Sequence, residues 1–200
     1  MILTRRLALL SAAILTLSAS SAIAQTPPVA AKCDTCSASP PMPVVGACDQ
    51  LINSKRVSGA ALGDALRARG YAYIRNKNYA FAKQDYDQAI KLNPNDIAAY
   101  GLRGVTFATM KRYDEAIADY TLVIQKMPAN HAAINMRGKA YLEKGLNKPA
   151  LQDFEQAIKL QPNNSEYQMN KTRALLRNIK DNQDELKKHG VTPTPLPQKQ

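Results

Sequence analysis

The chain has 200 residues and a formal net charge of +11, from 27 Lys and Arg against 16 Asp and Glu. The positive excess is spread thinly and forms no concentrated basic stripe, so we expect no nucleic acid partner. The sequence also lacks a glycine-rich phosphate loop, a His-centred nucleophile pair and a metal-ligand cluster, and its only His residues are His131 and His189. These observations argue against an enzyme, and we expect no cofactor and no metal.

Residues 1–24 have the parts of a secretory signal peptide. Arg5 and Arg6 precede an apolar run over residues 7–17, and the segment ends in a small-x-small pattern at Ala24. The run is shorter than the roughly 20 apolar residues that a membrane-spanning helix needs. We therefore expect cleavage after Ala24 and a periplasmic or secreted protein with no stable membrane span. An uncleaved membrane anchor is the alternative.

Residues 25–44 are rich in Pro and predict a linker. The linker contains Cys33 and Cys36, and Cys48 follows it. Export makes a disulfide chemically feasible, and we expect Cys48 to pair with Cys33 or Cys36. The C-x-x-C spacing also raises a thiol–disulfide redox module as an alternative, although a Pro-rich segment offers no helix N-terminus to lower a thiol pKa.

Residues 45–62 include a short amphipathic stretch in which Ala47, Cys48, Leu51 and Ile52 share one helical face. We interpret this segment as a degenerate half-repeat that covers the first full repeat.

Residues 63–164 consist of three consecutive units of equal length, in which the same residue types return at a fixed separation, called the repeat period below. The residues that mark the period are Gly70, Gly104 and Gly138, then Ala82, Ala116 and Ala150, then Tyr86, Tyr120 and Phe154, and finally Pro94, Pro128 and Pro162. A fixed period of this length is typical of stacked units in which each covers the apolar face of its neighbour. Apolar and small residues recur three, four and seven apart within each unit, which predicts two helices per unit. The expected helices are 63–75 and 79–92 in unit 63–96, 97–109 and 113–126 in unit 97–130, and 131–144 and 147–160 in unit 131–164.

These units resemble the tetratricopeptide repeat (TPR). That family carries small residues at positions 8, 20 and 27, aromatic residues at positions 11 and 24, and Pro at position 32, and Val123 at position 27 is a mild departure. The match covers about half of the chain. It implies an all-α fold, an α-solenoid of helix-turn-helix repeats in a right-handed TPR superhelix. The exported Cys-containing start is similar to small exported TPR proteins of alphaproteobacteria.

Gly recurs at position 8 of every unit, at Gly70, Gly104 and Gly138. Gly in a helix interior costs about 1 kcal/mol relative to Ala. Its recurrence therefore predicts a close approach between the two helices of a unit, where a larger side chain would overpack.

An Arg at position 7 and an Asp at position 23 also recur, so their separation is the same in every unit. The pairs are Arg69 and Asp85, Arg103 and Asp119, and Arg137 and Asp153. A guanidinium fork suits a carboxylate, so we expect each Arg to bond the Asp of its own unit across the two helices. A basic ladder that binds a ligand is the alternative.

Residues 165–188 predict a capping helix, in which Ser165 and Gln168 have capping-box spacing. Its apolar stripe is narrow and its remaining surface is charged, so we expect a water-exposed outer face at the end of the array. The stripe consists of Thr172, Leu175, Leu176, Ile179 and Leu186. Residues 189–200 hold three Pro residues and are expected to be a disordered tail.

The first helices of TPR units line a concave groove, so the resemblance implies where a partner binds. The implied groove residues are Arg67, Tyr71, Ile74 and Arg75 in the first unit, Gly101, Val105 and Ala108 in the second, and Asn135 and Lys139 in the third. The middle unit is small and apolar and cations lie at both ends, which suits an extended peptide or a partner helix with acidic flanks. The carboxylate clamp of co-chaperones is not supported, because most of its positions hold Tyr71, Leu102, Ala132 and Met136.

The sequence therefore predicts a non-catalytic interaction scaffold with a protein or peptide partner. Two alternatives stay open. One is the redox module at Cys33 and Cys36, and the other is a binder of an anionic cell-envelope polymer, which the positive net charge would suit.

Overall fold

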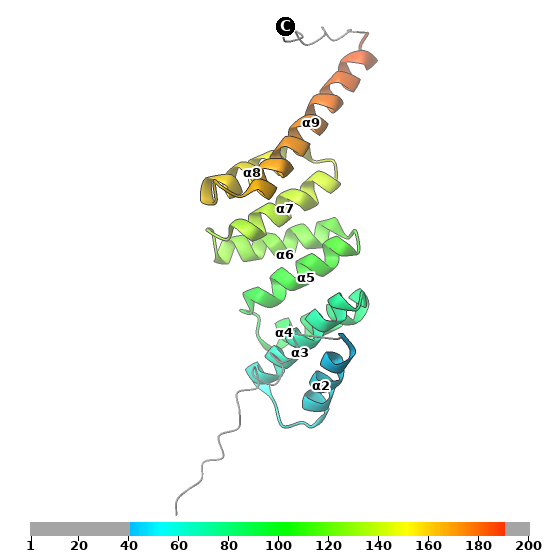
Figure 1. The fold of residues 1–200 in the computed structure, drawn as a ribbon, viewed down its shortest axis with the longest axis vertical. Helices are drawn as coiled ribbons and strands as arrows, with labels where there is room; N and C mark the ends of the chain where they lie inside the picture. Colours follow the sequence, from blue (N-terminus) through cyan, green and yellow to red (C-terminus); the bar gives the residue numbers. More distant parts are fainter. Residues whose placement is uncertain (1–40, 191–200) are drawn as a thin grey trace, which may run out of the picture.

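The structure is a computed structural model that describes residues 41–190. This part of the chain forms eight α-helices and no strands (Figure 1). The helices are α2 (Pro41–Asn53), α3 (Gly59–Arg75), α4 (Tyr79–Leu92), α5 (Ile97–Thr109), α6 (Tyr113–Lys126), α7 (His131–Glu143), α8 (Asn147–Leu160) and α9 (Ser165–Lys188). None of them is long and apolar enough to cross a membrane. The fold is the all-α solenoid that the sequence predicts.

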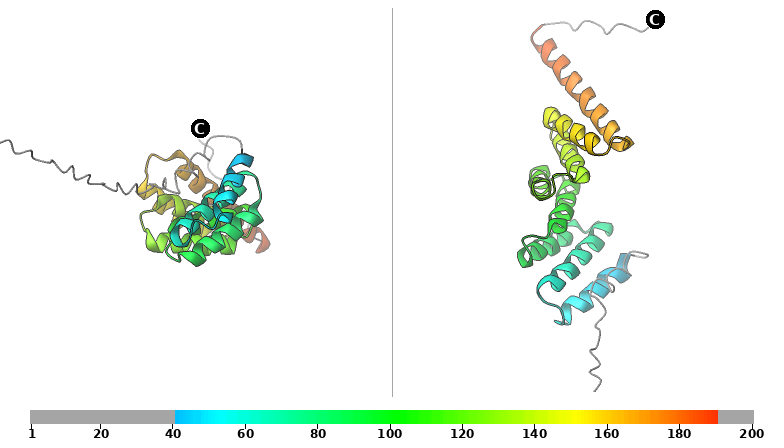
Figure 2. Two further views of the ribbon diagram at one scale, coloured as in Figure 1. Left: turned by 90° about the horizontal axis from the view of Figure 1, so that it is seen from below. Right: turned by 90° about the vertical axis from the view of Figure 1, so that its left-hand side faces the viewer.

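The helices stack in chain order along one long axis, with α2 and α9 at opposite ends (Figures 1 and 2). Within each unit the first helix packs on the second, in the pairs α3 with α4, α5 with α6, and α7 with α8. Each second helix then packs on the first helix of the next unit, and α8 packs on α9 in the same way. The first helices also contact one another in succession. The surface that α3, α5 and α7 form together is called the A-helix face below.

The largest differences from the predicted bounds lie at the N-terminal end. Helix α2 begins at Pro41, so the last four residues of the predicted linker are helical. Pro is compatible with the first turn of a helix because backbone N–H groups in that turn have no acceptor within the helix, so the N–H that Pro lacks is not missed. Helix α3 begins at Gly59, four residues before the expected start of the first unit, and follows Ser58 in extended conformation.

The core is a series of small clusters along the stack. One cluster joins Leu66, Ala89 and Ala99 from three successive helices, and Ile52 of α2 packs against it. Each helix has only one apolar face. Contacts of this kind between neighbouring units join these faces into a continuous apolar interior. The small buried Ala residues permit the close packing of helix on helix.

The turns inside the three units share one backbone conformation. Lys77, Lys111 and Gly145 are equivalent in the repeat and have φ of 59°, 60° and 77°. The following residue donates its N–H five residues back in each case, as from Arg112 to the Phe107 carbonyl at 2.8 Å. This is a Schellman motif, in which a left-handed residue closes the first helix.

The C-terminal end differs from the prediction in two ways. Asn164, not Ser165, caps α9, because its side chain accepts from the N–H groups of Glu166 and Tyr167. The predicted apolar stripe is not covered by the array, since Leu175, Leu176 and other members are largely exposed. The helix packs on the array through Tyr167, Asn170 and Ala174, which are buried instead. The outer face is exposed to water as expected, but the apolar stripe lies on it and faces solvent.

Candidate protein-binding face

The three repeated glycines lie where an aromatic ring of the second helix meets the backbone of the first. A Cβ on Gly104 would lie 2.8 Å from Tyr120 Cε1, and one on Gly138 would lie 2.8 Å from Phe154 Cε1. Gly70 meets Tyr86 in the same way. These rings are buried, so they have little room to move aside. The glycines set the spacing of the two helices in each unit.

Each repeated Arg forms a bidentate ion pair with the Asp of its own unit, as their constant separation predicts. Arg103 donates from Nε to Asp119 Oδ2 at 2.9 Å and from Nη2 to Asp119 Oδ1 at 2.8 Å. Arg69 and Arg137 make the same two bonds in their units. Because the guanidinium forks are occupied in this way, they connect the helices of a unit and do not form a free basic ladder.

The third guanidinium nitrogen makes a contact that the sequence reasoning missed. Nη1 of Arg103 donates to Asp87 Oδ1 of the preceding unit at 2.7 Å, and Nη1 of Arg137 donates to Thr121 Oγ1 at 3.2 Å. Asp87 and Thr121 are equivalent in the repeat, and both are polar. This recurrence of a polar residue is the feature of the sequence that could have predicted the contact. Each Arg therefore joins neighbouring units as well as the two helices of its own unit.

Hydrogen bonding and partial burial act in opposite directions on the pKa values of these pairs. The hydrogen bond to Asp119 raises the pKa of Arg103, which stays charged. Burial raises the pKa of the Asp119 carboxyl, and the bonds from Arg103 oppose that rise. Removal of the Arg alone would leave a buried carboxylate without its cation, which typically costs about 3–5 kcal/mol.

The first unit contributes the most accessible part of the A-helix face. Tyr71 is 51% exposed, Arg75 is exposed and Ile74 is half-buried. Arg67 lies between two carboxylates, with Nη2 at 2.5 Å from Asp64 and Nε at 3.5 Å from Asp96. The charge of Arg67 is therefore balanced within the protein.

The second unit forms a shallow apolar strip from Gly101, Val105 and Ala108, which are all half-buried. Val105 and Ala108 also pack against the cluster of Phe107, Ala116 and Tyr120. These residues thus support the core and still offer part of their surface to a partner.

The third unit departs from the predicted groove. Asn135 is only 1% exposed, and it accepts from Asn170 Nδ2 of α9 at 2.9 Å. Asn135 is therefore a buried contact between α7 and α9, and the prediction that it meets a partner is wrong. Lys139 is partly exposed and lies 3.4 Å from Glu166 of α9. The C-terminal helix thus closes this end of the A-helix face.

The predicted cysteine site is only partly within the described residues. Cys33 and Cys36 lie outside them, while Cys48 lies in α2 and is fully buried. The disulfide stays a prediction. Across residues 41–190, the structure brings together no group of three or more His, Cys, Asp or Glu side chains that could hold a metal ion.

Family comparisons place the same repeats on the sequence. Models of the tetratricopeptide repeat match residues 63–96, 85–118 and 131–164. The chain is a tetratricopeptide repeat protein. Two of the matched segments coincide with the units predicted from the repeat period.

Solved TPR structures share the fold of this TPR protein. The MamA RS-1 ArsTM double mutant is 20% identical with a TM-score of 0.68, over 81% of this chain and 88% of that chain. The first TPR of Spaghetti (RPAP3), bound to an HSP90 peptide, is 20% identical with a TM-score of 0.58, over 60% and 95% of the two chains. The Arabidopsis OM64 TPR domain is 26% identical with a TM-score of 0.56, over 58% and 97%. No curated protein matches the chain in sequence.

Proposed function

We propose that this TPR protein is a non-catalytic scaffold that binds an extended peptide or a partner helix on its A-helix face. The observations that carry the proposal are the exposure of Tyr71 on α3 and the half-buried apolar strip of Gly101, Val105 and Ala108 on α5, the next helix of the same face. A half-exposed aromatic side chain on one helix, with small residues that leave room on the next helix, suits an anchor for another polypeptide. The first TPR of Spaghetti, which shares the fold, is bound to a peptide.

The charges on this face indicate which charge the partner carries. Arg75 is exposed and makes no ion pair with any residue that the structure describes, whereas Arg67 is already paired with Asp64 and Asp96. Lys139 is paired with Glu166 at 3.4 Å and its side chain is still 44% exposed. An acidic group of the partner would therefore bind most favourably at Arg75, next to Tyr71.

We place this function in the periplasm or outside the cell. The support is the sequence of residues 1–24, whose removal would take away Arg5 and Arg6 and still leave the mature chain with a clear excess of positive charge. The expected partner is then an exported protein.

Site-specific photo-crosslinking tests the A-helix face. A photoreactive phenylalanine analogue replaces Tyr71 on α3 in one variant and Phe81 on α4 in a second. The two side chains are matched in exposure, at 51% and 54%. We expect illumination of cells that express the full chain to give a discrete crosslinked protein from position 71 and none from position 81.

Substitution then links the crosslink to binding. Val105→Asp, which places a charge in the apolar strip, should reduce the yield from position 71 at least about tenfold. The same product from both positions, or an unchanged yield with Val105→Asp, would contradict binding at the A-helix face.

A further inference from the structure

Helix α9 packs as the first helix of a fourth unit would. Asn164 caps α9 and lies one repeat period after Asn130, which caps α7 with its side chain in a similar way. Lys171 lies one period after Arg137, and its Nζ is 3.0 Å from Glu155 of the preceding unit. The contact resembles the one that Arg103 makes with Asp87 of its own preceding unit. The register of the repeat therefore continues into α9.

The face of α9 that a second helix would cover is exposed. In the third unit, Ile134 and Leu142 of α7 are 0% and 2% exposed, because α8 and α9 pack on α7. The residues one period later are Gln168 and Leu176, and Leu176 is 62% exposed. No helix that the structure describes follows α9, so this face has no partner from residues 41–190.

The exposed face is apolar along much of the helix. Its large side chains are Met169, Leu175, Leu176 and Ile179, which are 64%, 40%, 62% and 47% exposed. A shallow depression runs along its first half. The depression is lined by Gln168, Met169, Thr172, Arg173, Leu176 and Arg177. These six residues together with Leu175 and Ile179 are called the outer face of α9. An exposed patch with this many apolar side chains is typical of an interaction surface.

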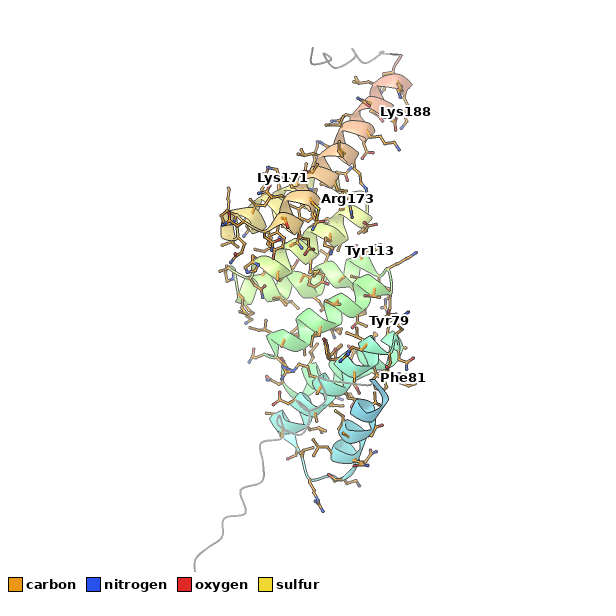
Figure 3. The ribbon with its side chains drawn as sticks, viewed as in Figure 1. Tyr79, Phe81, Tyr113, Lys171, Arg173 and Lys188 are labelled. Atoms are coloured by element: carbon orange, nitrogen blue, oxygen red, sulfur yellow. The ribbon has the colours of Figure 1, made fainter. Side chains whose placement is uncertain are left out.

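Basic side chains lie on the outer face and along its edges. Lys171 lacks the Asp that a second helix supplies to the Arg in each preceding unit, as Asp119 does for Arg103. Arg173 and Lys180 make no ion pair with any described residue. Figure 3 shows Lys171 and Arg173 where α9 passes the end of the array, with Lys188 far along the helix. An acidic partner would meet at least three cations here.

The same charges disfavour a second copy of the chain. Arg173, Lys180 and Lys187 recur at every seventh position and so lie on one side of α9. If two copies of α9 packed antiparallel, these sides would meet and would place Arg173 opposite Lys187 and Lys180 opposite Lys180. Like charges in such positions oppose pairing.

From these contacts we propose that the outer face of α9 binds an amphipathic helix of a partner protein, with acidic residues beside its apolar stripe, in the position of a second helix of a fourth unit. An acidic residue of that helix bonds Lys171 as Asp119 bonds Arg103. This surface is separate from the A-helix face at Tyr71, so the protein holds two partners, or two segments of one.

A peptide taken from the chain itself provides the probe. Residues 113–126 form α6, an acidic second helix whose Ala116, Tyr120 and Val123 are buried against α5 and α7 and whose Asp119 bonds Arg103. We would staple this peptide to hold it helical, label it with a fluorophore and measure fluorescence anisotropy with the full chain. We expect saturable binding, and at least about tenfold weaker binding when Asp119 of the peptide is replaced by Asn.

Variants of the full chain place the peptide on α9. Leu176→Ser together with Ile179→Ser should weaken binding at least about tenfold, since both lose apolar area that the complex buries. Lys171→Gln should weaken it several-fold. The matched control Lys188→Gln, at the far end of α9, and Tyr71→Ala, on the A-helix face, should leave binding unchanged. All substituted side chains are exposed or half-exposed, and circular dichroism checks that the helices are retained.

Other outcomes would overturn the proposal. These are no binding of the stapled peptide up to millimolar concentration, binding that Leu176→Ser with Ile179→Ser leaves unchanged, and loss of binding with Tyr71→Ala alone. Two further outcomes assign the face to another occupant. One is a dimer in sedimentation equilibrium that the Leu176 and Ile179 substitutions abolish, and the other is cosedimentation with phosphatidylglycerol vesicles without peptide binding.

Discussion

At the scale of single residues, the repeated glycines and aromatic rings fix the distance between the helices of a unit. Gly104 and Gly101 lie one turn apart on α5 and show how local the requirement is. A Cβ on Gly104 would meet the Tyr120 ring at 2.8 Å, whereas a Cβ on Gly101 would have Val123 Cγ2 as its nearest neighbour at 3.9 Å. Only the first glycine is needed for packing.

The two glycines should therefore respond to Ala with opposite signs. Gly104→Ala should lower the free energy of unfolding by about 1 kcal/mol, because the ring contact outweighs the gain in helix propensity. Gly101→Ala should raise it by up to about 1 kcal/mol, because the added methyl group fits. Urea unfolding measures both. Equal stability of the two variants would show that the ring moves aside freely.

At the scale of the elements, the turns inside the units hold different amino acids in the same left-handed backbone conformation. Gly145 adopts φ of 77° without steric cost, but Lys77 and Lys111 adopt 59° and 60° with a side chain present. A left-handed residue other than Gly is strained by the contact of its Cβ with the backbone. Hydrogen bonds on both sides, and the packing of α5 on α6, hold Lys111 in place.

Exchange of the residue types at these turns should change stability in a predictable direction. Lys111→Gly should raise the free energy of unfolding by about 0.5–1 kcal/mol, because the relief of strain exceeds the added entropy of the unfolded chain. Gly145→Lys should lower it by about 1 kcal/mol. Thermal and urea unfolding test both changes. A destabilised Lys111→Gly variant would mean that the Lys side chain contributes to the turn.

At the scale of the whole molecule, stability depends on contacts between neighbouring units, because a linear array has no single deep core. The repeated Arg residues provide one such contact at each junction. Arg69 reaches Asp49 of α2 and Arg103 reaches Asp87, both at 2.7 Å, but Arg137 reaches only the hydroxyl of Thr121 at 3.2 Å. The junction between the second and third units is therefore the one at which the repeated Arg has no charged acceptor.

A carboxylate at this junction should strengthen it. Thr121→Asp should raise the free energy of unfolding by about 0.5–1 kcal/mol, since Arg137 would then have the acceptor that Arg103 finds in Asp87. Thr121→Asn keeps the polarity and serves as the uncharged control. Chemical unfolding at low and at high salt separates the two, because salt should reduce the gain from Asp only. A loss of stability with Asp would indicate that repulsion by Asp153, which shares Arg137, outweighs the new pair.

Much of this architecture could be predicted from the sequence, because the repeat period reproduces the same contacts in each unit. The helices of the three units, the position of the glycines and the pairing of Arg103 with Asp119 all follow from spacing within one unit. The burial of Asn135 and the exposure of Leu176 could not be predicted in this way. Both depend on where α9 packs, and the sequence of α9 alone does not show which of its faces meets α7 and α8.

The amino-acid pattern by itself determined that the chain folds into paired helices, which residues close each pair, and which acid each Arg bonds, because these contacts lie within a single unit and recur in the next. Only the tertiary structure decided which surfaces are left for partners. A side chain at the end of a stack is covered or exposed according to the presence of a neighbouring helix, so Leu142 and Leu176, equivalent in register, are 2% and 62% exposed.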